Sequence, residues 1–147
     1  MIEPEVSPDG RQLAFADIYD ELWIANADGS GRRRLGSTTN QGEEPRWSPD
    51  GRRIAYLDPD AERLRILDVG SGAVRTLALK GVLQSAHAWS PDGRWLAVGR
   101  SVEYSCVDPT NNNLCPVTEL WIVNAFDGRK RRIVRMSGEI DGLDWRR

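Results

Sequence analysis

The tetrapeptide Ser-Pro-Asp-Gly occurs three times in this chain of 147 residues, and its spacing constrains the fold more than any other feature. The three copies begin at Ser7, Ser48 and Ser90, at intervals of 41 and 42 residues. Proline presets φ for the second position of a type I turn, aspartate suits the third, and glycine accepts the positive φ that is common at the fourth. Each copy therefore predicts a tight hairpin between two short strands.

The segments around each turn complete a unit of four short strands. The strand before the turn ends in tryptophan in two copies, at Trp47 and Trp89, and an apolar strand follows the turn. A third strand, a glycine turn and a basic fourth strand come next. Four strands in about 40–45 residues are typical of a β-propeller blade. We therefore expect an all-β partial propeller of three blades, at about 1–42, 43–84 and 85–138, and the first strand of a fourth at about 139–147.

Several motifs resemble the TolB-like, or WD-like, propeller repeat. They are Trp-Ser-Pro-Asp-Gly-Arg at 47–52 and 89–94, Leu-Trp-Ile at 22–24 and 120–122, and Asn-Ala-Asp-Gly at 26–29. The resemblance covers nearly the whole chain, and it implies a bacterial scaffold that binds protein or peptide partners. It also implies a periplasmic or extracellular location, although residues 1–5 lack the pattern of a secretory signal. Because propellers carry many unrelated activities, the resemblance is specific for the fold and not for the function.

The number of blades leaves the ring incomplete. Propellers close with about 4–8 blades, so three blades expose two apolar blade faces. Such faces mark an interface. Either further blades of a longer chain cover them, or two copies of the chain pair into a six-bladed ring.

The third blade carries an insertion at about 101–117. Gly93 and Trp121 are 28 residues apart, whereas Gly10 and Trp23 are 13 apart. The polar composition of the insertion predicts an exposed loop, which is either a recognition element or a neutral insertion. Cys106 and Cys115 both lie in it. We expect a disulfide between them, which would order the hairpin tip and indicate an oxidising compartment; a reactive thiol pair is the alternative, although Cys-x-x-Cys spacing is absent.

A search for catalytic motifs predicts no enzyme activity, no cofactor and no metal site. The sequence has no Gly-x-Ser-x-Gly elbow and no phosphate-binding glycine loop. Two cysteines and one histidine fall short of the four ligands of a structural zinc site. As a candidate binding surface at the mouth of the central channel we select Glu44, Arg46, His87 and Asp144, which lie on or near the innermost strands; the plainer interpretation is solvated polar residues and a structural histidine.

The charge distribution disfavours two classes of partner. With 20 basic and 22 acidic residues, the net charge of −2 gives no field that would attract nucleic acid or anionic lipid. The basic runs at 32–34 and 129–132 fall on predicted outermost strands, where basic side chains discourage edge-to-edge pairing. No window approaches the roughly 18–20 apolar residues of a membrane helix. We predict no nucleic-acid partner and no membrane insertion.

Three functions fit these patterns to different degrees. The first is a non-enzymatic scaffold for protein or peptide binding. The second is an accessory, substrate-gating propeller domain of a prolyl-oligopeptidase-type serine peptidase, in which an α/β-hydrolase segment would follow. The third, a propeller with its own active site such as a polysaccharide lyase, needs more histidines and metal ligands than these blades supply.

Overall fold

The computed structural model describes residues 4–37, 45–57, 63–78, 82–107 and 114–137, and Trp145. These residues form three four-stranded antiparallel sheets, in each of which neighbouring strands follow chain order. Blade 1 contains β1 (Glu5–Val6), β2 (Gln12–Ala16), β3 (Glu21–Asn26) and β4 (Arg33–Ser37). Blade 2 contains β5 (Arg46–Trp47), β6 (Arg53–Leu57), β7 (Arg63–Asp68) and β8 (Val74–Ala78). Blade 3 contains β9 (Val82–Trp89), β10 (Trp95–Val107), β11 (Leu114–Asn124) and β12 (Lys130–Ser137).

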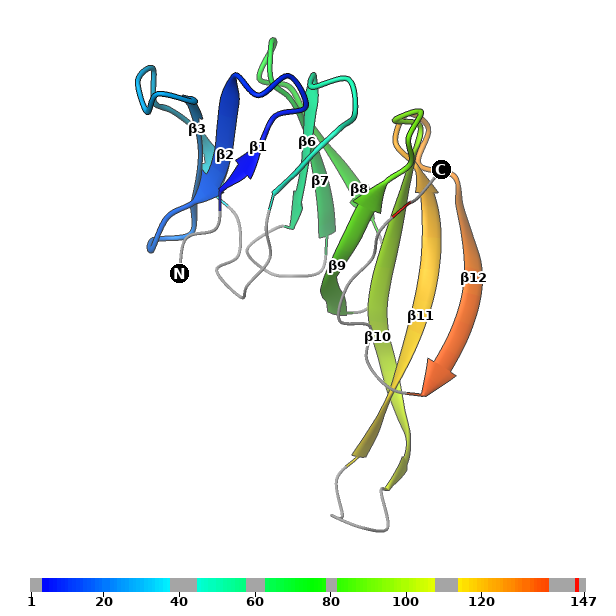
Figure 1. Cartoon of the computed structure of the whole chain (residues 1–147). Coiled ribbons are helices and arrows are strands. Elements are labelled where there is room, and N and C mark those ends of the chain that lie inside the picture. Colours follow the sequence, from blue (N-terminus) through cyan, green and yellow to red (C-terminus); the bar gives the residue numbers. More distant parts are fainter. Residues whose placement is uncertain are drawn as a thin grey trace.

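The three sheets stand side by side as successive blades (Figure 1). This arrangement confirms the expected all-β partial propeller. The strand expected to open a fourth blade lies outside the described residues, apart from Trp145. The described part of the chain contains no helix with the length and apolar character that a membrane crossing requires.

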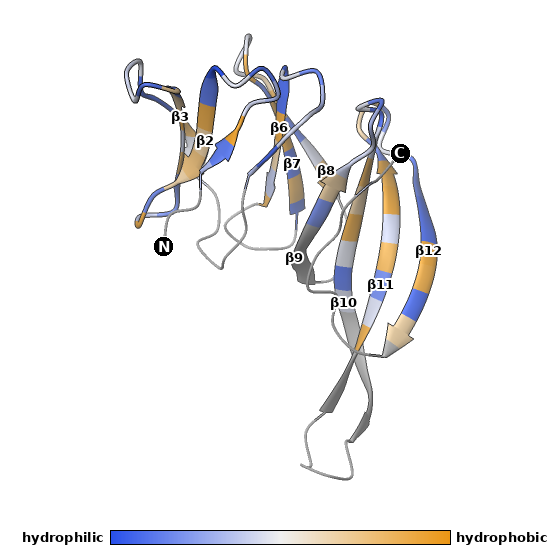
Figure 2. Cartoon of the chain, in the orientation of Figure 1, coloured by the Kyte–Doolittle hydropathy of each residue, from blue (hydrophilic) through white to orange (hydrophobic). Residues whose placement is uncertain are grey.

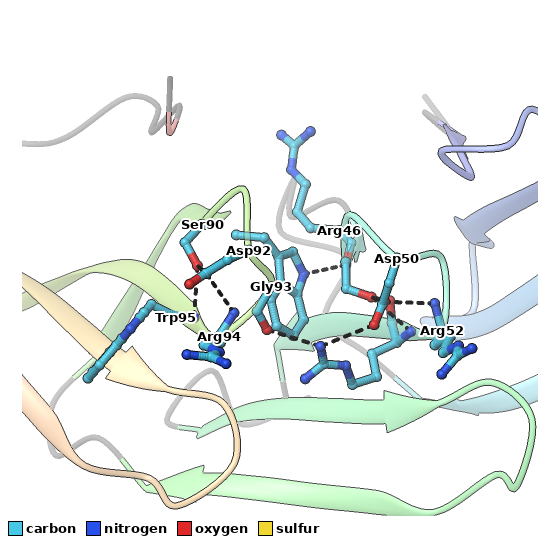
Figure 3. Close-up of polar contacts among 11 residues, drawn as sticks. Arg46, Asp50, Arg52, Ser90, Asp92, Gly93, Arg94 and Trp95 are labelled. Atoms are coloured by element: carbon cyan, nitrogen blue, oxygen red, sulfur yellow. Dashed lines mark hydrogen bonds and ion pairs between the residues drawn. The ribbon is translucent and has the colours of Figure 1, made fainter. Parts of the chain in front are cut away.

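The Ser-Pro-Asp-Gly turns have the predicted conformation. Gly10, Gly51 and Gly93 have φ of +71°, +67° and +66°, and each glycine amide donates to the carbonyl of the turn's serine at 2.8 Å. In blade 3 the Ser90 hydroxyl donates to Asp92 at 2.6 Å and accepts from the Trp95 amide at 2.9 Å. Figure 3 shows this cluster beside the equivalent turn of blade 2. The serine and aspartate thus fix the turn from inside, a role that their turn propensity alone did not predict.

Successive turns also contact one another. The Pro8 ring lies 3.7 Å from the position that a Cβ would take at Gly51, and the Pro49 ring lies at the same distance from that of Gly93. Among the described atoms, none lies within 4 Å of the equivalent position at Gly10. The proline of each turn therefore packs against the glycine of the next turn. Gly10, in the first turn, has no such neighbour among the described atoms.

Alanine substitutions at two of these glycines should differ in cost. Gly93→Ala should lower the free energy of unfolding by about 2 kcal/mol or more, because the left-handed conformation alone costs about 1–2 kcal/mol for an alanine. At Gly93 the new Cβ would also stand 3.2 Å from Nη2 of Arg53. Gly10→Ala is the matched control, because it has the same backbone strain and open space. Urea unfolding of both variants measures the difference, and equal losses would contradict it.

The core lies between blades. One cluster joins blades 1 and 2 and contains Ala14, Leu22, Ile24, Trp47, Ile54, Tyr56 and Leu67. The other joins blades 2 and 3 and contains Ala55, Leu57, Leu64, Ile66, Leu77, Trp89, Leu96, Val98, Val123 and Ala125. Apolar and polar residues alternate along the strands in Figure 2, as expected when side chains point to opposite faces of a sheet. Blade 2 thus buries both of its faces against its neighbours.

The insertion of blade 3 differs from the expected loop. β10 continues to Val107 and β11 begins at Leu114, so much of 101–117 extends a long hairpin instead of forming irregular structure. The β-branched and aromatic residues of this segment, such as Val102, Tyr104 and Val117, favour strands; its asparagines lie outside the described residues. Cys106 and Cys115 are direct cross-strand partners in this hairpin. Figure 1 shows the hairpin extending well beyond the other strands.

Candidate functional site

Tryptophan indoles link the innermost strands of the blades. The Trp47 indole donates to the Glu5 carbonyl at 3.1 Å, and the Trp89 indole donates to the Arg46 carbonyl at 3.0 Å. Each bond runs from one blade to the strand before it, because the tryptophan ends an inner strand and turns back toward its neighbour. These hydrogen bonds fix the spacing of the inner strands β1, β5 and β9 around the expected propeller axis.

A cavity of about 340 Å³ opens between these strands. Its wall combines aromatic rings with a cation, an anion and a histidine. The lining residues are Glu5, Arg46, Trp47, Pro49, His87, Ala88, Trp89 and Trp145. Concave sites with apolar walls and a few polar groups are the usual form of a binding site, so this cavity is the candidate functional site.

Two charged side chains give the cavity its polar character. Nη1 of Arg46 lies 4.0 Å from Oε1 of Glu5, and these side chains are 43% and 26% exposed. The other oxygen of the Glu5 carboxylate accepts from the Trp47 amide at 2.7 Å. The Arg46 side chain extends away from the turns in Figure 3. The Glu5 carboxylate is therefore held by a backbone amide beside the partly exposed Arg46 side chain.

The structure describes two of the four residues selected from the sequence. Arg46 and His87 both line the cavity. His87 is only 2% exposed, and its Nε2 lies 3.4 Å from the Ala55 carbonyl, so its ring packs against blade 2. Glu44 and Asp144 lie outside the described residues. The sequence analysis did not select Glu5 or the tryptophans as site residues; the signal that would have added them is their position at the ends of the inner strands.

A second polar cluster lies within blade 3, on β10, β11 and β12. The Glu119 side chain is 3% exposed and is bound by Arg100 at 2.7 Å and Arg132 at 2.6 Å. The Trp121 indole donates to it at 2.9 Å, and the Arg100 guanidinium stacks 4.8 Å from the centre of the Trp121 ring. Burial raises the pKa of Glu119, but the hydrogen bonds from Arg100, Arg132 and Trp121 outweigh it and lower the pKa to about 2. The cluster is fully bonded, so it braces the base of the long hairpin.

Metal ligation finds no support in the described ranges. No group of three or more histidine, cysteine, aspartate or glutamate residues there is placed to hold a metal ion. The aspartates of the turns serve the backbone instead: hydrogen bonds from the Ser90 hydroxyl and the Arg94 amide hold the pKa of Asp92 below its ordinary value.

Comparison with known proteins finds a peptidase of similar sequence and solved structures of similar fold. No family model matches the chain. An alignment of 103 positions is 32% identical to dipeptidyl-peptidase 5 of Porphyromonas endodontalis, and it covers 62% of this chain and 15% of that protein. The chain therefore spans only a small part of the peptidase.

Solved structures with a similar backbone identify the fold. An oligogalacturonate lyase in complex with manganese superposes with a TM-score of 0.69 at 14% identity, over 88% of this chain and 38% of that one. TolB from Acinetobacter baumannii superposes with a TM-score of 0.58 at 22% identity, over 88% of this chain and 31% of that one. The fold is that of a TolB-like β-propeller. At these identities the likeness concerns the fold alone, and this TolB-like propeller spans less than half of each matched chain.

Proposed function

We propose that this TolB-like propeller is a non-enzymatic scaffold that binds a protein or peptide segment in the cavity between its inner strands. The observation that carries the proposal is the combination of Trp47, Trp89 and Trp145 with the partly exposed Arg46 around one cavity. Trp145 is half-buried and supplies an aromatic contact at low entropic cost, and an arginine fork binds carboxylates and backbone carbonyls with defined geometry. The expected ligand is an extended peptide with apolar side chains and an acidic group.

Binding to immobilised short peptides of varied sequence tests this function. For peptides that bind, Arg46→Glu should weaken binding at least tenfold, because the reversed charge repels the acidic group and loses the guanidinium contacts. Arg94→Glu is the control, since it makes the same charge change on an exposed turn outside the cavity. Equal binding by both variants, or an equal loss in both, would place the binding surface elsewhere.

A second function is favoured by one comparison. The 32% identity to dipeptidyl-peptidase 5 suits an accessory, substrate-gating propeller of a prolyl-oligopeptidase-type serine peptidase. Sequencing the gene downstream of the propeller separates the two functions. An α/β-hydrolase segment with a Gly-x-Ser-x-Gly motif and a later histidine would assign the peptidase role; its absence would leave the scaffold.

We also propose a periplasmic or extracellular location, which rests on the TolB-like fold and the two cysteines. Directly opposed residues of antiparallel strands have Cα atoms about 4.5–5.5 Å apart, within the range that a disulfide spans. The register of Cys106 and Cys115 therefore suits a disulfide, formed as two thiols lose two electrons and two protons to an oxidant of that compartment. Peptide mapping of protein purified without reductant should recover the linked pair, and two alkylated thiols would contradict it.

A further inference from the structure

A second cavity lies between blades 2 and 3, beside the turns that join β7 to β8 and β11 to β12. Its volume is about 230 Å³. A cavity of roughly 150 Å³ with apolar walls is large enough to bind benzene, so this one has room for a ring and a polar group. Most of its lining is apolar. The lining residues are Arg53, Ile66, Asp68, Ala73, Val74, Arg75, Ala125 and Phe126.

A difference between the two blade junctions leaves this space. Val69 and Ala125 hold equivalent positions, because the amide of each donates to the carbonyl of the arginine that follows the Ser-Pro-Asp-Gly turn of its own blade. Val69 packs against the core cluster that joins blades 1 and 2. Ala125 is smaller than valine by two methyl groups. The side chain that fills space at the first junction is therefore truncated at the second.

The arginine beside this space also differs between the junctions. Arg33 and Arg75 hold equivalent positions on the outer strands β4 and β8. The Arg33 guanidinium donates to the Val69 carbonyl at 2.9 Å. Among the described residues no corresponding bond joins Arg75 to Ala125, and the Arg75 side chain lines the cavity instead. Arg75 therefore lacks the contact that binds its counterpart to the neighbouring blade.

The other charges of the lining are already paired. Arg53 has a carboxylate oxygen of Asp50 at 3.5 Å. Hydrogen bonds from the Ser71 amide and hydroxyl, with the charge of Arg53, hold the pKa of Asp68 below its ordinary value. Arg75 has no ion pair within the described ranges. The cavity thus has one uncompensated positive charge, which favours a ligand with a negative group.

Phe126 gives the cavity an exposed aromatic wall. It stands where the turn of blade 2 has Gly70, and it is 56% exposed. The Arg53 guanidinium lies 4.6 Å from the centre of the Phe126 ring and 5.0 Å from that of Trp89, so one side of the phenylalanine is anchored. Val74, also in the lining, is 45% exposed. Neighbouring apolar side chains that remain exposed are typical of a binding surface.

We propose that this cavity is a second binding site, and that its ligand is a carboxylate with one aromatic or branched aliphatic group. The apolar group packs against Phe126 and Val74, and the carboxylate accepts hydrogen bonds from the Arg75 guanidinium. The site is separate from the cavity of the inner strands, with which it shares no lining residue. A free organic acid and the last residue of a peptide both offer this chemistry.

Titration of the full chain with small acids, followed by the amide resonances in NMR spectra, tests the site. We expect 3-phenylpropionate to shift the amides of Val74, Ala125 and Phe126. The neutral 3-phenylpropionamide should bind at least tenfold more weakly, because it lacks the carboxylate. No saturable shift at these amides, or equal binding of the two compounds, would overturn the proposal. Shifts confined to residues of the inner-strand cavity would overturn it as well.

A peptide separates the two sources of the carboxylate. Acetyl-Ala-Ala-Phe with a free carboxyl terminus presents the same group at the end of a chain. If it binds more tightly than 3-phenylpropionate, the site is assigned to peptide termini. If it binds more weakly, the site is assigned to free acids. Either result supports the carboxylate site, since both probes carry the group that Arg75 is expected to bind.

Three variants locate the bound acid. Ala125→Val introduces the residue that blade 2 has at this position, so it should fill the cavity and weaken binding of 3-phenylpropionate at least tenfold. Arg75→Gln should weaken binding to a similar degree, because it removes the positive charge. Arg131→Gln is the control, since it makes the same change at the equivalent position of β12, outside the cavity. An equal loss in both arginine variants, or unchanged binding in Ala125→Val and Arg75→Gln, would contradict the site.

Discussion

Replacing Trp89 with alanine is expected to lower the free energy of unfolding by about 4 kcal/mol, the usual cost of deleting a large buried aromatic side chain. Trp89 is 8% exposed and belongs to the cluster that joins blades 2 and 3. Its indole also donates to the Arg46 carbonyl, and the Arg53 guanidinium stacks 5.0 Å from the centre of its ring. The truncation would therefore leave a cavity at one junction, remove the indole hydrogen bond to the Arg46 carbonyl, and remove one of the two aromatic rings that Arg53 contacts. Urea unfolding followed by circular dichroism measures the loss.

Two further variants divide this effect into its parts. Trp89→Phe keeps most of the apolar contact and loses the indole hydrogen bond, so it should cost about 1–2 kcal/mol. Trp95→Ala removes a tryptophan that has no tryptophan at the equivalent position of the other blades and is only half-buried, so it should cost clearly less than Trp89→Ala. Equal costs for Trp95→Ala and Trp89→Ala would show that the Trp89 side chain is not a main contact between blades.

Replacing Glu119 with glutamine should cost about 3 kcal/mol at neutral pH, because it leaves two arginines without their buried counter-ion. Arg100 and Arg132 both bind this carboxylate, and its side chain is 3% exposed. The matched control is Glu21→Gln in blade 1. There Glu21 pairs with Arg34 at 2.9 Å, but its side chain is 32% exposed, so the loss should stay below about 1 kcal/mol.

The Glu119 cluster also makes stability depend on pH in a defined window. The pKa of Glu119 in the folded chain is lowered from 4.5 to about 2, so the folded state binds its proton less readily than the unfolded state does. The resulting stabilisation is present above about pH 4.5 and is lost as the pH falls toward 2. Unfolding curves between pH 5 and pH 2 should therefore converge for the native chain and Glu119→Gln. Parallel curves would show that the carboxylate does not titrate with folding.

Sequence reasoning predicted the parts of the molecule that repeat. The positive φ at Gly10, Gly51 and Gly93, and the four short strands of each blade, follow from motifs that recur at blade spacing. The repeated pattern predicts them because each blade faces the same packing problem as the next.

Features that occur once were harder to predict. The Glu119 cluster depends on Arg100 and Arg132, which lie 19 and 13 residues away, and only the register of β10, β11 and β12 brings them together. The long hairpin was expected to be a loop because its asparagines and prolines are conspicuous, while the strand preference of its other residues is spread along both arms. His87 was correctly placed on the innermost strand, but its burial against Ala55 comes from the neighbouring blade and has no local signal.

The contact between each turn proline and the glycine of the next turn affects where the chain can accept inserted residues. It ties successive blades together at the end that carries the Ser-Pro-Asp-Gly turns, where an added residue would shift every later blade. At the opposite end, β10 and β11 of blade 3 form a longer hairpin than β2 and β3 of blade 1, while Gly93 keeps a positive φ like that of Gly10. Foreign peptide sequences intended for display should therefore be grafted between β10 and β11, where they lengthen one arm and leave the spacing of the blades unchanged.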